Sequence, residues 1–107
     1  MQQPFNAEND VDENGNPAGG FAGGIGFSIE WQRGPLSVDG VRKEPNGAFV
    51  ETILAAVKQR IEHYQDSRFA CEENADAIVL IGQAIKRLDY RTRRRIEAGV
   101  EGTHKGN

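Results

Sequence analysis

The chain has few of the residues that hold metals or form disulfides. Its 107 residues include one cysteine, Cys71, and two histidines, His63 and His104. A single cysteine cannot form an internal disulfide, and these three residues are too few for a Cys/His zinc cluster. The sequence therefore predicts no metal and no redox chemistry, and it indicates no other cofactor.

Long apolar runs are also missing. No stretch approaches the roughly 20 apolar residues that a helix needs to cross a bilayer, and the N-terminus MQQPFNAEND lacks the basic and apolar regions of a signal peptide. We therefore expect a cytoplasmic protein with no membrane partner. A chain of this length buries a small share of its surface, so we also expect self-association.

Positive charge is absent from the beginning of the chain. Residues 1–24 contain no Lys or Arg and are rich in Asn, Gly and Pro, and their acidic residues are Glu8, Asp10, Asp12 and Glu13. Such a segment buries too little apolar area to offset the entropy lost when it is ordered. We therefore expect a flexible acidic arm over residues 1–24, followed by a single domain over residues 25–107.

The domain is expected to begin with a β ribbon over residues 25–45. Its first strand is predicted from apolar residues that alternate with small or polar ones, namely Ile25, Phe27, Ile29 and Trp31. A weaker strand is expected over residues 36–41, antiparallel to the first. Because a lone hairpin is marginally stable, this ribbon must pack on helices or on another chain.

From residue 46 the apolar spacing changes to that of helices. One stripe comprises Val50, Leu54, Val57, Ile61 and Tyr64, and a second comprises Cys71, Asn74, Ile78, Ile81, Ile85, Leu88, Thr92 and Arg95. Spacings of three and four place each set on one helical face. Asn46 and Ser67 are predicted to cap the two helices, and Gly99 to end the second. The sequence thus predicts an oligomeric α+β fold with a long antiparallel helical hairpin over residues 46–98 and a tail over 99–107.

Two polar side chains near the predicted turn are candidates for binding a nucleobase. Tyr64 offers a ring for stacking, and Asn74 offers an amide that can hydrogen-bond the edge of a base. Structural roles are equally open: Asn74 could fix the helix register or cap a helix, and Tyr64 could be a core aromatic whose hydroxyl reaches water.

Four arginines gather on one side of the second predicted helix. They are Arg87, Arg91, Arg94 and Arg95. The guanidinium forks of Arg91 and Arg95, one turn apart, suit phosphate oxygens. The alternatives are a solvated run that the helix dipole stabilises, or a contact with carboxylates of another chain. Because the whole chain has a net charge of −3, so dense a positive cluster favours an anionic partner.

Four short strings carry a resemblance to a known family. NGAFVE, SRFACEENA, RTRRR and GVEGTH occur in this order from residue 46 to residue 104. In these strings the chain resembles the Acb/Tad hairpin family of phage proteins, in particular the Thoeris anti-defence sponges, over residues 31–105. The resemblance implies an oligomer, built from dimers and often hexameric, that is not an enzyme. It further implies binding of cyclic nucleotide immune signals, such as cyclic ADP-ribose isomers and in some cases cyclic di- or trinucleotides, which silences the defence of the infected bacterium.

The resemblance also implies roles for particular residues. Tyr64 and Asn74 would help to form the cyclic ADP-ribose pocket, and Arg91 and Arg95 would contact phosphates. This sequence departs from the family pattern by adding Arg93 and Arg94 and by placing Ile96 after them. The added charge would either broaden the range of ligands or serve a different contact between subunits.

The separation between the candidate residues limits the kind of site they can form. Asn74 and Arg91 are seventeen residues apart, which is about 25 Å along a continuous helix. Either the two ends serve different ligands, or an antiparallel dimer brings them together. The added arginines favour separate sites, because they enlarge the positive patch beyond what one pyrophosphate requires.

Three other classes of function are an enzyme, a nucleic-acid binder and an adaptor. An enzyme is not predicted, because Cys71 has no adjacent His and no paired carboxylates stand in a recognisable frame. Two alternatives stay open. One is an Arg-rich hairpin that binds nucleic acid, which the negative net charge disfavours. The other is a helical adaptor that inhibits a host protein.

Overall fold

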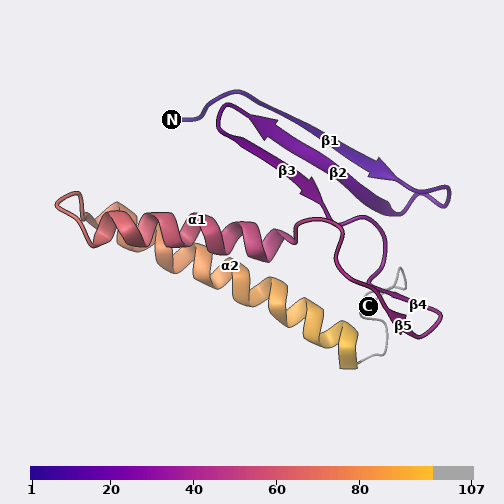
Figure 1. Cartoon of the computed structure of the whole chain (residues 1–107). Coiled ribbons are helices and arrows are strands. Elements are labelled where there is room, and N and C mark those ends of the chain that lie inside the picture. The colour runs from indigo at the N-terminus through magenta and orange to yellow at the C-terminus, as the bar shows by residue number, and fades with distance from the viewer. Residues whose placement is uncertain (98–107) are drawn as a thin grey trace. The chain divides into compact units, whose positions relative to one another are not determined.

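The computed structural model of the chain has the expected α+β composition (Figure 1). It describes residues 1–97, with only the backbone for Val38 and for residues 95–97. The elements in chain order are β1 (Phe5–Val11), β2 (Pro17–Gly24), β3 (Phe27–Trp31), β4 (Ser37–Val38), β5 (Val41–Arg42), α1 (Val50–Gln65) and α2 (Glu72–Glu97). The chain forms two compact units, a sheet unit that contains Met1–Phe49 and a hairpin unit, Val50–Arg94. The units do not follow the predicted boundary at residue 25.

The expected flexible arm is wrong for most of residues 1–24, because they form two of the three strands of an antiparallel sheet. The strand order is β1-β2-β3, so that β2 lies in the centre. The glycines of β2 allow close pairing. Gly20 has a φ of +131°, and a Cβ there would collide with the carbonyl oxygen of Glu8 in β1. The glycine content thus reflects strands that approach closely, and not a chain without structure.

The register gives the sheet one mainly apolar face and one mainly polar face. Residues that lie opposite one another in an antiparallel sheet share a face. One face carries the triplets Phe5–Gly24–Phe27, Ala7–Ala22–Ile29 and Asn9–Gly20–Trp31, and the other carries Asn6–Gly23–Ser28 and Glu8–Phe21–Glu30. The rings of Phe5 and Phe27 meet across Gly24, with centroids 6.4 Å apart. The alternation predicted for residues 25–31 is therefore confirmed as β3, but the partner of β3 is β2.

The predicted strand over residues 36–41 is replaced by a separate small hairpin. β4 and β5 pair with each other, Ser37 with Arg42 and Val38 with Val41. The two residues of the turn, Asp39 and Gly40, both have positive φ, at 52° and 78°. Two-residue hairpins favour this turn geometry because its twist matches that of the strands.

The predicted cap role of Asn46 is also wrong. Its side chain accepts a hydrogen bond from the backbone N–H of Arg33 at 2.8 Å and donates one to the carbonyl of Arg33 at 3.0 Å. The following backbone continues along β3, because Ala48 donates to the carbonyl of Glu30 and accepts from Gln32. Asn46 therefore ties a strand-like segment to the edge of the sheet, and α1 begins four residues later, at Val50.

The helical hairpin is confirmed as two helices joined by a short turn. Ser67 lies in that turn and does not cap α2: its hydroxyl donates to the carbonyl of Tyr64, in the last turn of α1, and accepts from the N–H of Phe69. α2 begins only at Glu72, and the predicted end at Gly99 lies outside the described residues. Within the described part of the chain, neither helix is long and apolar enough to span a membrane.

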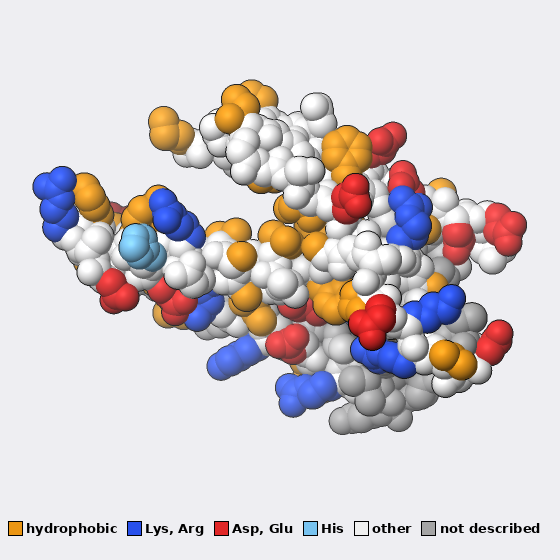
Figure 2. All heavy atoms as spheres, viewed as in Figure 1, with side chains coloured by type: hydrophobic (Ala, Val, Ile, Leu, Met, Phe, Trp, Pro, Cys, Tyr) orange, Lys and Arg blue, Asp and Glu red, His pale blue; other side chains and the backbone are white. Residues whose placement is uncertain are grey.

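Only the second predicted stripe is largely the seam of the hairpin. Asn74, Ile78, Ile81, Ile85, Leu88 and Thr92 are all half-buried, while Cys71 is exposed and the side chain of Arg95 lies outside the described residues. In α1 the predicted stripe divides. Leu54 and Ile61 are half-buried, but Val50, Val57 and Tyr64 are 47%, 46% and 41% exposed. Figure 2 shows hydrophobic side chains uncovered along the hairpin.

A large buried core is missing from the described residues. Ala18 in β2 is the one hydrophobic residue among them that is buried, and no side chain of α1 is. An isolated copy therefore leaves apolar surface of both units in water, which costs about 25 cal/mol per Å² compared with burial.

Candidate functional site

The two candidate base-binding residues lie at the same end of the hairpin. Tyr64 is in the last turn of α1 and Asn74 is in the first turn of α2. The amide of Asn74 donates to the carbonyl of Phe69 at 3.4 Å, so it supports the turn between the helices. Its carbonyl oxygen has no hydrogen-bond partner among the described residues, which leaves an acceptor available.

The ring of Tyr64 already has cationic and aromatic neighbours. The guanidinium carbon of Arg60, one turn earlier, lies 4.9 Å from the ring centroid, and the His63 ring lies 6.2 Å away. A guanidinium over a ring is attracted by the π electrons. The 41% exposure of Tyr64 leaves ring surface for stacking.

The arginines occupy the far end of α2. Arg87, Arg91 and Arg94 follow spacings of four and three, so they share one side of the helix. Arg87 and Arg94 flank the ring of Tyr90 between them, at 5.9 and 5.6 Å from its centroid. Arg91 is exposed and makes no ion pair or hydrogen bond within the described residues.

Arg93 does not belong to this cluster. It is two residues from Arg91, which places it about 200° around the helix. The positive patch is therefore smaller than the sequence suggested. Of the two added arginines, only Arg94 lies on the same side of the helix as Arg91. The structure does not describe the side chain of Arg95, the other predicted phosphate ligand.

The structure does not bring the two ends of the predicted site together within one hairpin. α2 runs without interruption from Glu72 to Glu97 and contains both Asn74 and Arg91. At 1.5 Å per residue these positions are about 25 Å apart along the helix axis. One hairpin thus presents a stacking and amide end and, separately, a cationic end.

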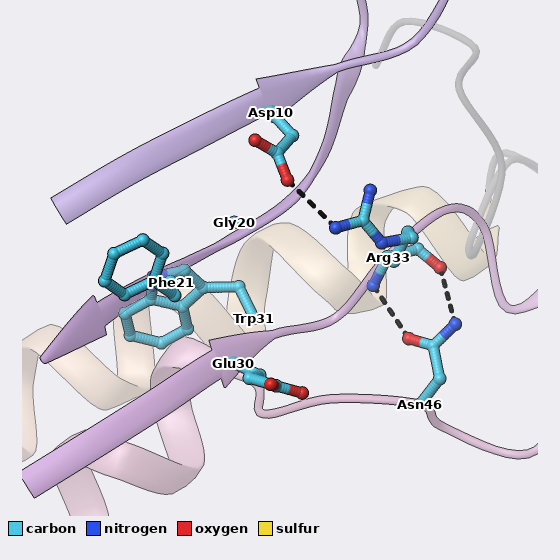
Figure 3. A pocket seen from close by; sticks show the side chains of 7 residues that line it. All are labelled: Asp10, Gly20, Phe21, Glu30, Trp31, Arg33 and Asn46. Atoms are coloured by element: carbon cyan, nitrogen blue, oxygen red, sulfur yellow. Dashed lines mark hydrogen bonds and ion pairs between the residues drawn. The ribbon is translucent and has the colours of Figure 1, made fainter.

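A cavity on the sheet unit escaped the sequence reasoning. It has a volume of about 350 Å³ and is lined by Asp10, Gly20, Phe21, Glu30, Trp31, Arg33 and Asn46 (Figure 3). Arg33 forms an ion pair with Asp10 at 2.9 Å. Three of these residues lie within the segment interpreted as a flexible arm, which is why the cavity was missed.

Comparison with known proteins identifies a relative of this chain. No family model matches the chain. A curated protein of Bacillus phage SBSphiJ7, "Thoeris anti-defense 1", is 39% identical over 84 residues, which are 78% of this chain. The chain covers 56% of the length of that relative. At this identity over most of the chain the similarity reflects common descent.

Proposed function

Because the chain belongs to the Thoeris anti-defence family, we propose that it is a phage anti-defence sponge. It binds cyclic nucleotide immune signals in the infected bacterium and keeps them from the host's defence. The ligands are cyclic ADP-ribose isomers and, as further candidates, cyclic di- and trinucleotides. The observation that carries the proposal, besides the family, is an exposed Arg91 beside two further arginines with no carboxylate to neutralise them among the described residues.

We assign the binding to the two ends of the hairpin. The ring of Tyr64 stacks on a base, the free carbonyl of Asn74 accepts from its edge, and Arg91, with Arg87, Arg94 and Arg95 near it, contacts phosphate oxygens. Charge-assisted hydrogen bonds of this kind are about twice as strong as neutral ones. Binding holds the ligand without cleaving it, because these residues include no activated nucleophile and no acid–base pair.

A complete site is proposed to require a second copy of the chain. The exposed residues Val50, Val57 and Tyr64 recur every seven residues and form one apolar stripe along α1. A dimer that buries this stripe in antiparallel fashion sets the arginine end of one copy beside the tyrosine end of the other, which removes the 25 Å separation. Larger assemblies then form from such dimers.

Thermal unfolding with a panel of ligands tests the function. The panel contains cyclic ADP-ribose isomers, cyclic di- and trinucleotides, and short single-stranded RNA. A ligand at a hundredfold excess over its Kd stabilises the protein by about 2.7 kcal/mol. We expect this for at least one cyclic nucleotide, and the ligand should be recovered intact after heat denaturation. A stabilisation by RNA alone would favour the nucleic-acid alternative, and no stabilisation at all would favour the adaptor.

A further inference from the structure

The cavity on the sheet unit is separate from the residues assigned above. All seven residues that line it belong to the sheet unit. Its volume of about 350 Å³ is near the lower end of the range for small-molecule sites, which begins at about 300 Å³. It therefore suits one nucleoside-sized group and is too small for a whole cyclic oligonucleotide.

One wall of the cavity is an aromatic ring beside a carboxylate. Phe21 in β2 and Glu30 in β3 lie directly opposite each other, so their side chains share one face of the sheet. Phe21 is 39% exposed, which leaves a ring face for stacking. The carboxylate of Glu30 forms no ion pair or hydrogen bond with the described residues, so both of its oxygens remain acceptors.

Arg33, which also lines the cavity, supplies hydrogen-bond donors. Figure 3 shows Arg33 held between Asp10 and Asn46. The guanidinium of Arg33 uses one nitrogen for Asp10, at 2.9 Å, and its other N–H groups have no partner among the described residues. The backbone of Arg33 is fixed on both sides by Asn46, whose own N–H donates to the side chain of Gln32 at 3.0 Å. The backbone of Arg33 is thus fixed, while its guanidinium is 60% exposed and accessible to a ligand.

We propose that this cavity binds a guanine base. Guanine has a planar ring for Phe21, and its Watson–Crick edge carries the acceptor O6 next to the donors N1–H and N2–H. A carboxylate such as that of Glu30 accepts from both of these donors, and a guanidinium such as that of Arg33 donates to O6.

The same groups reject adenine. Its N1 is an acceptor, so a lone pair would face the carboxylate of Glu30, and a buried or half-buried acceptor without a donor is costly. The cavity is lined by two carboxylates and one guanidinium, so its net charge also disfavours a phosphate inside it. The inference uses only the sheet unit and does not rest on the proposed function of the hairpin.

Titration of the full chain with guanosine tests the proposal. Trp31 lines the cavity, but its ring lies on the other face of the sheet from Phe21, so the NMR signal of its backbone N–H is followed. We expect a saturable shift with guanosine, weaker binding of inosine, which lacks the N2 amino group, and no binding of adenosine. Glu30→Gln should raise the Kd for guanosine about tenfold or more.

Glu8→Gln is the matched control. Glu8 flanks Phe21 from the other side, in β1, and does not line the cavity. The two variants lose the same charge from the same face of the sheet, but Glu8→Gln should leave guanosine binding unchanged. Equal affinity for adenosine, a Kd that Glu30→Gln does not change, or no shift with guanosine would each overturn the inference. Guanosine has no phosphate, so it tests the cavity of the sheet unit alone. Cyclic ADP-ribose has no guanine, so it tests the proposed function of the hairpin alone.

Discussion

At the scale of single residues, the arginines of α2 differ in what they can contact. Arg87 and Arg94 lie near the ring of Tyr90, whereas Arg91 lies between them in sequence and is exposed. A guanidinium that rests against a ring is partly held in place, and one without a neighbour is free to meet a ligand. Arg91 is therefore the residue whose loss should matter most for phosphate binding.

Arg91→Ala should weaken the binding of a cyclic nucleotide by about ten- to a hundredfold, because a hydrogen bond to a charged group contributes about 1.5–3 kcal/mol. Arg93→Ala is the matched control, since it removes the same charge on the opposite side of the helix and should change the Kd little. Isothermal titration calorimetry measures both. Equal losses in the two variants would mean that the arginines act only through the overall field of the protein, and that Arg91 makes no direct contact.

At the scale of elements, the sequence predicted the helices better than the sheet. The spacing of Ile78, Ile81 and Ile85 determines a helical face whatever the neighbours are, so the seam of α2 could be predicted. The strand β2 could not, because its glycines and alanines show no apolar alternation and its pairing with β1 depends on backbone contacts. The predicted cap at Asn46 was wrong for a similar reason. An Asn before a helix often caps it, but here the side chain of Asn46 binds the backbone of Arg33, thirteen residues away.

The sequence predicted where the candidate residues lie on the helices, but not what they contact. Sequence identified Tyr64 and Asn74 at a turn and the arginines on the second helix, and the structure places them there. It could not show that Arg60 lies over the ring of Tyr64 or that Asn74 supports the turn through Phe69. Those contacts depend on side-chain conformations, which the pattern of residue types does not encode.

Gly20→Ala tests whether close pairing explains the glycines of β2. A methyl group there meets the backbone of Glu8, so β1 must move away, and the φ of +131° adds strain. Gly26→Ala is the matched control, because Gly26 also has a positive φ, +85°, but open space around it. The control should cost about 1–3 kcal/mol, and Gly20→Ala should cost more. Urea unfolding followed by Trp31 fluorescence measures the difference, and equal costs would show that β1 is loosely held.

At the scale of the whole molecule, the uncovered apolar surface predicts assembly. The stripe of Val50, Val57 and Tyr64 is too exposed to stabilise one hairpin, so we expect dimers or multiples of dimers by light scattering. Val57→Glu should shift the chain towards smaller species, because the dimer would bury an unpaired charge. Gln59→Glu, about 200° around α1, should not. A monomer at micromolar concentration for the unaltered chain would contradict the proposed assembly.

A dimer would also decide whether the two ends of the hairpin form one site. Because Arg93 lies about 200° around the helix from Arg91, the added arginines give less reason to expect separate sites, and we propose a shared one. In a two-fold dimer each pocket would take Tyr64 from one copy and Arg91 from the other. Both Tyr64→Ala and Arg91→Ala should then weaken the same ligand, the former by about 1–3 kcal/mol from lost stacking.

Mixing the two variants separates the shared site from two independent ones. A co-refolded dimer of one Tyr64→Ala chain with one Arg91→Ala chain has one pocket with both lesions and one with neither. In an equal mixture about a quarter of the pockets should therefore regain full affinity, since half of the dimers are mixed. Calorimetry gives this fraction as the stoichiometry of the tight component, after light scattering has confirmed that each variant still assembles. If the two sites are independent, each variant should lose the binding of a different ligand, and mixing should restore no tight binding.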